Sequence, residues 1–337
     1  MKATTRSSNM GGFGRWFKRI LMGIPVLILF LAAFMWMVGA QAKSKLAKQN
    51  PPPGQLVDAG GFKMHLYCTG EGSRAVILEA GMNDFYVSWA KVQPEISKFT
   101  RVCSYDRAGL GWSEASPHSR TSEVMAEELH SLLMKAELPG PYVLVGHSFG
   151  GINVRQFAHQ YPDEVAGMVL VDSAHEEQGT RLPFLRSAAD QFISQFHTLS
   201  ILSSLGLMAL SPDAIPNRGL PEEANKQYQA VLATTKYFDS AIAESTAFYS
   251  IQGSAPESLG DLPLIVISHG LPDLTLGLTE AEQAQFEQEW AAMQAELFGL
   301  SSNSKQIIAQ QSGHYIQLDQ PDLVVETIRE ILQTAQK

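Results

Sequence analysis

The residue best placed for covalent chemistry is Ser148, which lies in a G-x-S-x-G pattern over residues 146–150. A nucleophilic serine must project from a tight, strained strand-to-helix turn, and glycine at Gly146 and Gly150 removes the side chains that would clash there. A pattern this short also arises by chance, so its surroundings decide its meaning. A buried strand pattern precedes it and a helical pattern follows it, which predicts a nucleophile elbow with Ser148 at its tip.

A serine hydroxyl is a poor nucleophile unless a base takes its proton. Of the nine histidines, His314 follows the last predicted strand and precedes the final helix. That loop lies at the carboxyl edge of the sheet, where open α/β sheets form their sites, so His314 is the predicted general base. His175 and His269 are weaker candidates. The histidines expected to lie on the surface or in packing positions are His65, His118, His130, His147 and His159.

The elements that must position these residues follow an alternating pattern. From residue 55 onward, short apolar runs alternate with amphipathic stretches, which predicts an α/β fold with a mostly parallel sheet and helices on both faces. Gly60 and Gly61 predict a hairpin between the first two strands. The predicted strands are residues 55–59, 63–68, 75–79, 101–105, 142–146, 168–171, 264–268 and 306–309. The predicted helices are residues 121–138, 151–161, 279–298, with a capping box of Thr279 and Glu282, and one that begins at Pro321.

One region, about residues 174–260, breaks the alternation because it carries helical patterns and no strand pattern. Phe, Leu and Met are frequent over residues 184–210. The region is too long for an ordinary connection, which predicts a helical cap inserted between two strands. Residues 55–337 are therefore expected to form one domain that includes this cap.

The N-terminal segment has the composition of a membrane anchor. Residues 20–40 carry no charge and have about the length that crosses a bilayer as a helix. The excess of basic residues before this segment predicts a cytoplasmic tail over residues 1–19 and a body outside the membrane. Cleavage near Ala42, which would leave a secreted or periplasmic body, is the alternative, because Ala40-Gln41-Ala42 has a small-x-small form. The Pro-rich residues 41–54 predict a linker.

Charge is unevenly distributed along the chain. The formal net charge is −9, but no acidic residue precedes Asp58, and eight of the 25 basic residues lie at or before Lys48. The body that remains carries 17 basic against 34 acidic residues. Such a body repels nucleic acid and anionic surfaces, so a small neutral or apolar molecule is the expected partner.

These features resemble the α/β-hydrolase-fold serine hydrolases. The resemblance rests on Ser148 in its elbow, on Gly313-His314 near the C-terminus, and on the Asp-Arg-Ala-Gly-Leu-Gly loop of residues 106–111. It covers the chain from about Gln55 to the end. It implies that Ser148 attacks a carbonyl group while backbone N–H groups hold the oxyanion.

The resemblance also implies the two oxyanion donors. One is the amide of Phe149, which follows the nucleophile. The other belongs just after the third strand, where many family members carry His-Gly and this chain carries Ala80-Gly81-Met82. Met82 is the donor implied by that position.

Two aspartates compete for the role of triad acid, which accepts the imidazole N–H and stabilises the imidazolium. Asp273 follows the seventh strand, where most of the family place this residue. Asp172 ends the sixth strand and matches the less common placement. Both alternatives remain open at this point.

Only two cysteines occur, Cys68 and Cys103. An extracytoplasmic body permits a disulfide between them, and two buried thiols are the alternative. The strands that carry the two cysteines are neighbours in the sheet of the family that this chain resembles, so a disulfide is geometrically possible.

Several other classes of site are excluded by the motifs. Gly109-x-Gly111 lacks the third glycine of a dinucleotide site, at Glu114. No metal or other cofactor is predicted, because His175-Glu176-Glu177 is a poor ligand set and no metal-site spacing occurs. Ser148 also argues against the haloalkane dehalogenases and epoxide hydrolases, which share the fold that this chain resembles but use Asp at that position.

The leading functional prediction is hydrolysis of a carboxylic ester through an acyl-enzyme at Ser148. The apolar cap favours an apolar acyl or aromatic group on the substrate. The same triad serves amide, peptide, thioester or carbon–carbon hydrolysis and acyl transfer. A lipase that draws substrate from the bilayer and a non-catalytic binding protein of the same fold are further alternatives.

Overall fold

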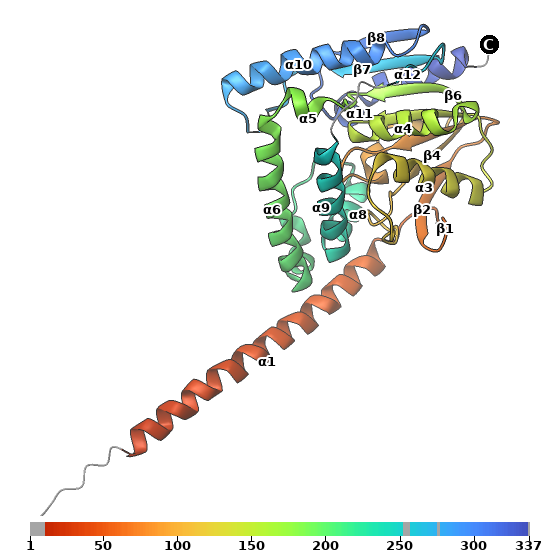
Figure 1. The fold of residues 1–337 in the computed structure, drawn as a ribbon. Coiled ribbons are helices and arrows are strands. Elements are labelled where there is room, and N and C mark those ends of the chain that lie inside the picture. Colours follow the sequence, from red (N-terminus) through yellow and green to blue (C-terminus); the bar gives the residue numbers. More distant parts are fainter. Residues whose placement is uncertain (1–10, 252–256, 275–276, 336–337) are drawn as a thin grey trace, which may run out of the picture.

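A single eight-stranded sheet forms the centre of the structure, a computed structural model that describes residues 11–251, 257–274 and 277–335. The spatial order is β1-β2-β4-β3-β5-β6-β7-β8, with β1/β2 and β2/β4 antiparallel and the other pairs parallel. Strands β1 and β2 lie at one edge of the sheet, and β7 and β8 lie at the other (Figure 1). The predicted mostly parallel sheet and its first hairpin are confirmed. The strands are β1 (Gln55–Asp58), β2 (Lys63–Thr69), β3 (Ala75–Glu79), β4 (Arg101–Tyr105), β5 (Tyr142–His147), β6 (Val165–Val171), β7 (Leu264–His269) and β8 (Ser304–Ala309).

Helices cover both faces of this sheet. The α-helices are α1 (Gly11–Gln49), α2 (Gln93–Ile96), α3 (Ser122–Lys135), α4 (Phe149–Gln160), α5 (Gln178–Arg181), α6 (Phe184–Ser204), α7 (Leu207–Leu210), α8 (Glu222–Leu232), α9 (Thr235–Ser250), α10 (Glu280–Phe298), α11 (Ile316–Asp319) and α12 (Pro321–Thr334). Short 3₁₀ turns lie at η1 (Tyr86–Trp89), η2 (Pro162–Glu164) and η3 (Pro212–Ala214). Helix α10 begins with the predicted capping box of Thr279 and Glu282.

The central strands β3, β5, β6 and β7 are nearly continuous apolar runs because both of their faces are buried. Along β5, Leu144 points to a core shared with α3 and α4. Its neighbours Val143 and Val145 point to the opposite core, shared with α2 and α12. Successive strand side chains alternate between faces, so one strand stabilises two helical layers.

The region between β6 and β7 is helical where the structure describes it, from α5 to α9. Helices α6 and α9 lie side by side at one end of the sheet (Figure 1). Phe196 of α6 and Phe238 of α9 share a buried cluster with Phe85 and Leu110 of the body. These helices therefore pack onto the body around an apolar core. Residues 252–256 of the predicted cap lie outside the described residues.

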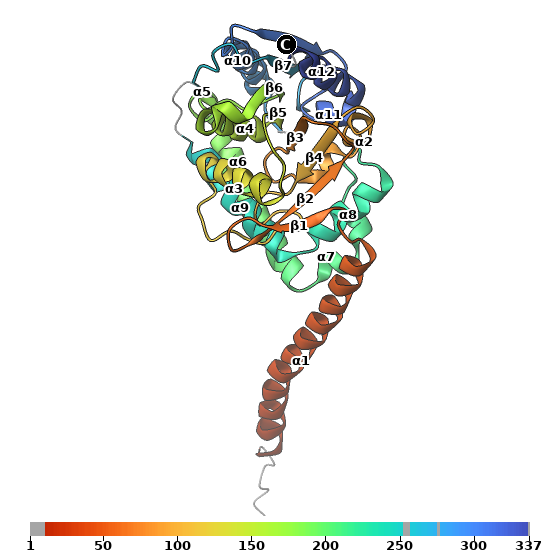
Figure 2. The ribbon, with the colours of Figure 1, turned by 90° about the vertical axis from the view of Figure 1, so that its right-hand side faces the viewer.

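Helix α1 projects from the body as a rod (Figure 2). It contains the predicted anchor, and among the described residues it is the one helix long and apolar enough to cross a membrane. An 18-residue stretch within Met22–Gln49 has a mean hydropathy of 2.2. The helix continues through the first part of the predicted linker to Gln49. Residues 1–10 of the predicted basic tail lie outside the described residues.

Cys68 and Cys103 form a disulfide in the structure. They lie directly opposite each other on the antiparallel strands β2 and β4. The bond joins the hairpin at one edge of the sheet to the parallel strands.

Candidate active site

Ser148 lies at the turn between β5 and α4 in a backbone conformation that non-glycine residues rarely adopt. Its φ is 51° and its ψ is −123°. A Cβ atom on Gly146 would lie 2.6 Å from the Gly150 carbonyl oxygen, and one on Gly150 would lie 2.6 Å from the Ala80 carbonyl oxygen. Both glycines are therefore required by close backbone approach, as the motif predicts. The turn leaves the serine side chain half-buried.

Hydrogen bonds of the main chain hold this turn against the next strand. The Ser148 N–H donates to the Val171 carbonyl oxygen at 3.1 Å, at the end of β6. The Asp172 N–H donates in turn to Ile267 of β7 at 2.7 Å. Ser148 and Asp172 thus lie on neighbouring strands at the carboxyl edge of the sheet, where His314 also lies.

His314 is hydrogen-bonded to Asp172. Its Nδ1 donates to Asp172 Oδ2 at 2.6 Å, and its side chain keeps 19% of its surface exposed while that of Asp172 is fully buried. Nδ1 carries a single proton, so this bond leaves Nε2 as the nitrogen free to act as a base. Among the hydrogen bonds of the described residues, none joins His314 to Ser148.

Asp172 is surrounded by donors. Besides His314, it accepts from His269 Nδ1 at 2.8 Å, from the His269 backbone N–H at 3.1 Å and from Trp290 Nε1 at 2.9 Å. Burial by itself raises the pKa of Asp172, but the hydrogen bonds from His269 and His314 hold that pKa well below its usual range. The carboxylate is therefore ionised at neutral pH.

The other predicted acid, Asp273, lies in the loop after β7 and is 9% exposed. The contact made by His314 Nδ1 is with Asp172, at the end of β6. Of the two aspartates left open by the sequence, Asp172 is thus the one that the structure brings to the imidazole.

His269, a weaker candidate for the base, is the second imidazole on Asp172. Its Nε2 donates to Glu287 Oε2 of α10 at 2.9 Å, so both ring nitrogens donate to carboxylates. Burial lowers the pKa of His269, but the hydrogen bonds to Asp172 and Glu287 outweigh it and raise the pKa to about 9. His269 is accordingly a charged partner of Asp172 with neither nitrogen free to accept a proton. Sequence reasoning missed this arrangement.

His147, expected in a packing position, is buried directly beside the predicted base. Its Nε2 donates to the His314 carbonyl oxygen at 3.0 Å. Burial lowers the pKa of His147 to about 3, so the ring is neutral. A neutral ring that donates to the main chain of His314 holds the loop of the base without competing for protons.

The turn that carries the implied oxyanion donor lies against the nucleophile. A Cβ atom on Gly81 would lie 3.3 Å from the Ser148 Cβ and 2.8 Å from His147 Nδ1. Met82 follows in that turn, and Phe149 is the first residue of α4, whose N-terminal amides have no partner within the helix. The two implied donors therefore come from segments that flank Ser148.

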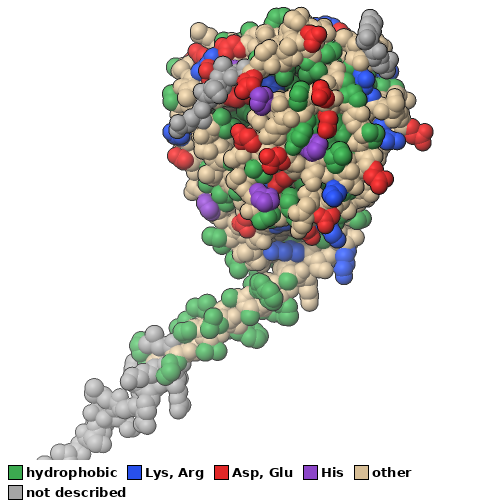
Figure 3. All heavy atoms as spheres, turned by 45° about the vertical axis from the view of Figure 1, so that its right-hand side comes forward, with side chains coloured by type: hydrophobic (Ala, Val, Ile, Leu, Met, Phe, Trp, Pro, Cys, Tyr) green, Lys and Arg blue, Asp and Glu red, His purple; other side chains and the backbone are tan. Residues whose placement is uncertain are grey.

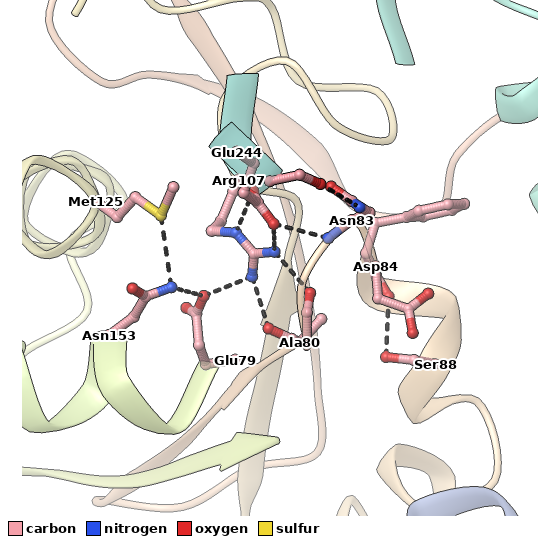
Figure 4. A network of polar contacts seen from close by, with 12 residues as sticks. Glu79, Ala80, Asn83, Asp84, Ser88, Arg107, Met125, Asn153 and Glu244 are labelled. Carbon is pink, nitrogen blue, oxygen red and sulfur yellow. Dashed lines mark hydrogen bonds and ion pairs between the residues drawn. The ribbon is translucent and has the colours of Figure 1, made fainter. Parts of the chain in front are cut away.

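Arg107, in the loop that carries the resemblance, holds this turn in place (Figure 4). Its guanidinium donates to the carbonyl oxygens of Ala80 and Gly81 at 2.6 and 2.7 Å. It also forms buried ion pairs with Glu79 at 2.7 Å and with Glu244 of α9 at 2.5 Å. Burial lowers the pKa of Arg107, but the charges of Glu244 and Glu79 outweigh it and keep the guanidinium ionised.

The cap helix α9 also contacts the turn directly. The Asn83 N–H donates to Glu244 Oε1 at 2.7 Å, and the Asn83 side chain donates to Ser245 at 3.0 Å. Tyr237 donates its hydroxyl to the Asn83 carbonyl oxygen at 3.0 Å. Residues 80–83 are thus bonded both to the body, through Arg107, and to the cap. Nothing in the sequence pairs Glu244 with Arg107, because 137 residues separate them.

His175, another weaker candidate, lies in a cluster with two carboxylates. Ligand-type atoms of His175, Glu177 and Glu296 lie within 4.8 Å of one another. Arg181 pairs with both carboxylates, at 2.6 Å from Glu177 and 2.7 Å from Glu296. Arg181 therefore supplies the positive charge that balances the two carboxylates, as a metal ion would otherwise do.

Comparison with known proteins places the chain in a family. A family model described as the alpha/beta hydrolase fold matches residues 74–321. YbdG, an uncharacterized Bacillus subtilis protein, is 25% identical over 328 residues, which cover 94% of this chain and 96% of the relative.

Two solved structures show the same likeness. A thermophilic esterase from Thermogutta terrifontis is 21% identical with a TM-score of 0.57, over 85% of this chain and all of that chain (100%). Epoxide hydrolase CorEH is 16% identical with a TM-score of 0.61, over 83% of this chain and 98% of that chain. At these identities the structural likeness shows the fold.

Proposed function

Since the chain belongs to the α/β-hydrolase family, we propose that it is a serine hydrolase that cleaves a carboxylic ester with Ser148, His314 and Asp172 as its triad. The observation that carries the proposal is the strained Ser148 turn, with φ at 51°, on the sheet edge where His314 Nδ1 donates to Asp172 at 2.6 Å. A serine in this position also favours acyl chemistry over the chemistry of family members with an aspartate nucleophile.

The proposed reaction proceeds through an acyl-enzyme. Ser148 Oγ attacks the ester carbonyl carbon as its proton passes to His314 Nε2, and the ionised Asp172 stabilises the imidazolium. The amides of Phe149 and Met82 donate to the oxyanion that forms. The tetrahedral intermediate collapses when His314 returns the proton to the leaving alcohol. Water, deprotonated by the same nitrogen, then attacks the acyl carbon. His314 passes that proton to Ser148 Oγ as the Oγ–acyl bond breaks and the acid is released.

The position of the base depends on groups around it as well as on the triad. His147 donates to the main chain of His314, and Asp172 is fixed by Trp290 and His269. Hydrogen bonds of this kind hold an imidazole in one tautomer and one orientation. In the proposed function these residues are positioning groups that touch no substrate.

The test uses the full chain in detergent with p-nitrophenyl esters of increasing acyl length and with a fluorophosphonate probe of active-site serines. Wild type should turn over ester and label at residue 148, while Ser148→Ala does neither and His314→Ala loses turnover. The optimum acyl length then measures the pocket. Labelling without turnover on any ester would reject the ester substrate and keep the triad. Wild type that neither labels nor turns over would favour the binding-protein interpretation.

We also propose that α1 anchors the protein in a membrane, with the N-terminus cytoplasmic and the body on the other side. The apolar side chains of α1 described between residues 22 and 37 are exposed, as lipid contact requires. A disulfide between Cys68 and Cys103 fits an oxidising compartment. In sealed right-side-out vesicles, external protease should digest the body. Protection of the body in these vesicles would reverse the orientation.

A further inference from the structure

The cap rests on the proposed anchor helix through a close contact between two glycines. Gly39 of α1 is buried, and a Cβ atom on it would overlap the Leu205 carbonyl oxygen and lie 2.7 Å from the Gly206 Cα. Gly206 joins α6 to α7 with a φ of 76°. One turn further along α1, Lys43 Nζ donates to the Ser204 carbonyl oxygen at 3.4 Å. The junction of α6 and α7 is therefore held beside one defined turn of α1, at Gly39.

Gly39 lies at the end of the apolar stretch of α1. Residues 20–40 are uncharged, and at about 1.5 Å per residue they span about 30 Å, the thickness of the hydrocarbon core. Gly39 lies at the last turn of this stretch, and Lys43, Lys45 and Lys48 follow it. A bilayer that covers the stretch would have its boundary at the level of Leu205 and Gly206.

The surface of the cap at this level is apolar and exposed. Exposed fractions are 62% for Ile201, 36% for Leu202, 38% for Leu205 and 41% for Leu210. We call these four residues the cap tip. No Asp, Glu, Lys or Arg occurs in residues 191–212, although the body is strongly acidic. Hydrophobic side chains also line the rod as it leaves the body (Figure 3).

We propose that the cap tip is a bilayer-contact surface, seated in the interface of the membrane that α1 crosses. The proposal rests on the proposed anchor. The contact is apolar, so a neutral phosphatidylcholine bilayer suffices and added salt does not release it. The three lysines after Gly39 lie at the level of the headgroup layer, where long lysine side chains at a helix end extend their ammonium groups into water. Leucine side chains at the cap tip gain the burial that they lack on the body.

This surface bears on the proposed reaction because the cap reaches both the bilayer and the active site. Helix α6, which ends at the cap tip, packs along α9. Helix α9 carries Glu244, which is bonded to Arg107 and to the Asn83 amide in the turn of residues 80–83. A bilayer that holds the cap tip therefore brings the site close to esters that partition into lipid.

The experiment measures bilayer depth in the full chain, reconstituted in phosphatidylcholine nanodiscs. Leu205→Cys and Leu210→Cys each carry a nitroxide label, and Cys68 and Cys103 are held as a disulfide and stay unlabelled. Met134→Cys, 56% exposed on α3, is the matched control on the body, and Leu29→Cys, 69% exposed on α1, is the depth control. Electron paramagnetic resonance compares collision with oxygen, which enters the bilayer, and with a nickel chelate, which stays in water.

We expect label at residue 29 to collide with oxygen only, labels at 205 and 210 to lose most nickel collision, and label at 134 to keep it. If the label at residue 29 collides with oxygen only, while the labels at 205 and 210 collide with nickel as often as the label at 134, the cap-tip proposal is overturned and the anchor is kept. Nickel collision at residue 29 would overturn both. Shielding of 205 and 210 from both agents would assign the surface to a second copy of the chain, which also overturns bilayer contact.

Discussion

His269 and His314 donate hydrogen bonds to one carboxylate oxygen, Oδ2 of Asp172, at 2.8 and 2.6 Å. The first imidazole is paired on its other side with Glu287, while the second is left with Nε2 available. The same carboxylate therefore fixes a charged structural histidine and a candidate base. This sharing explains how a fully buried aspartate stays ionised beside the proposed nucleophile.

The choice between the two aspartates can be tested by amide substitution. Asp172→Asn should lower kcat on a p-nitrophenyl ester by on the order of 10³–10⁴, because the amide favours the wrong tautomer of His314. Asp273→Asn is the matched control and should keep most of the activity. Circular dichroism of both variants checks the fold. The reverse ranking of the two variants would assign the acid to Asp273.

The raised pKa of His269 makes stability depend on pH. The folded chain binds this proton more tightly than the unfolded chain, so the contribution is complete below pH 6.5 and is lost as pH rises through about 9. The free energy of unfolding of wild type should fall over this window by at most about 3 kcal/mol more than that of His269→Gln. Thermal melting in detergent at several pH values measures the difference. Parallel curves for the two proteins would refute the charged His269.

Arg107 should be required for stability. Arg107→Ala leaves Glu79 and Glu244 buried without their cation, which should cost about 3–5 kcal/mol of unfolding free energy. Arg329→Ala is the control, because that side chain is 43% exposed and makes only a surface ion pair with Glu326 and a contact over the Phe99 ring, so its loss should cost about 1 kcal/mol. Thermal melting compares the two. A small loss for Arg107→Ala would contradict its role as the anchor of residues 80–83.

Because Ser148 has a strained backbone, replacing it with glycine should remove activity but stabilise the fold relative to alanine. A non-glycine residue at this φ costs about 1–3 kcal/mol, and the extra freedom of glycine in the unfolded chain offsets up to about 1 kcal/mol. Ser148→Gly should therefore be more stable than Ser148→Ala by about 1 kcal/mol, and both should lack ester turnover. Equal melting temperatures for the two variants would argue against a strained elbow.

Much of the fold could be predicted from local patterns. All eight strands occur at the predicted places, and the central ones were the easiest to predict because strands buried on both faces need apolar, β-branched runs. The capping box of Thr279 and Glu282 could be predicted because the two residues lie three positions apart in the sequence. Boundaries differ by a few residues: β6 begins at Val165 rather than 168, and α4 begins at Phe149 rather than 151. Helix α1 also extends into the predicted linker, where Lys43 contacts the cap.

By itself the sequence determined the nucleophile candidate, the histidine candidate and the apolar segment, since each is recognised by residues adjacent in the chain. Only the tertiary structure decided which aspartate meets His314, because three elements far apart in sequence, at the ends of β6, β7 and β8, converge there. The pairing of Arg107 with Glu244 and the contact of Gly39 with Gly206 arise in the same way. Contacts between distant segments depend on how the layers pack, and no spacing along the chain encodes that.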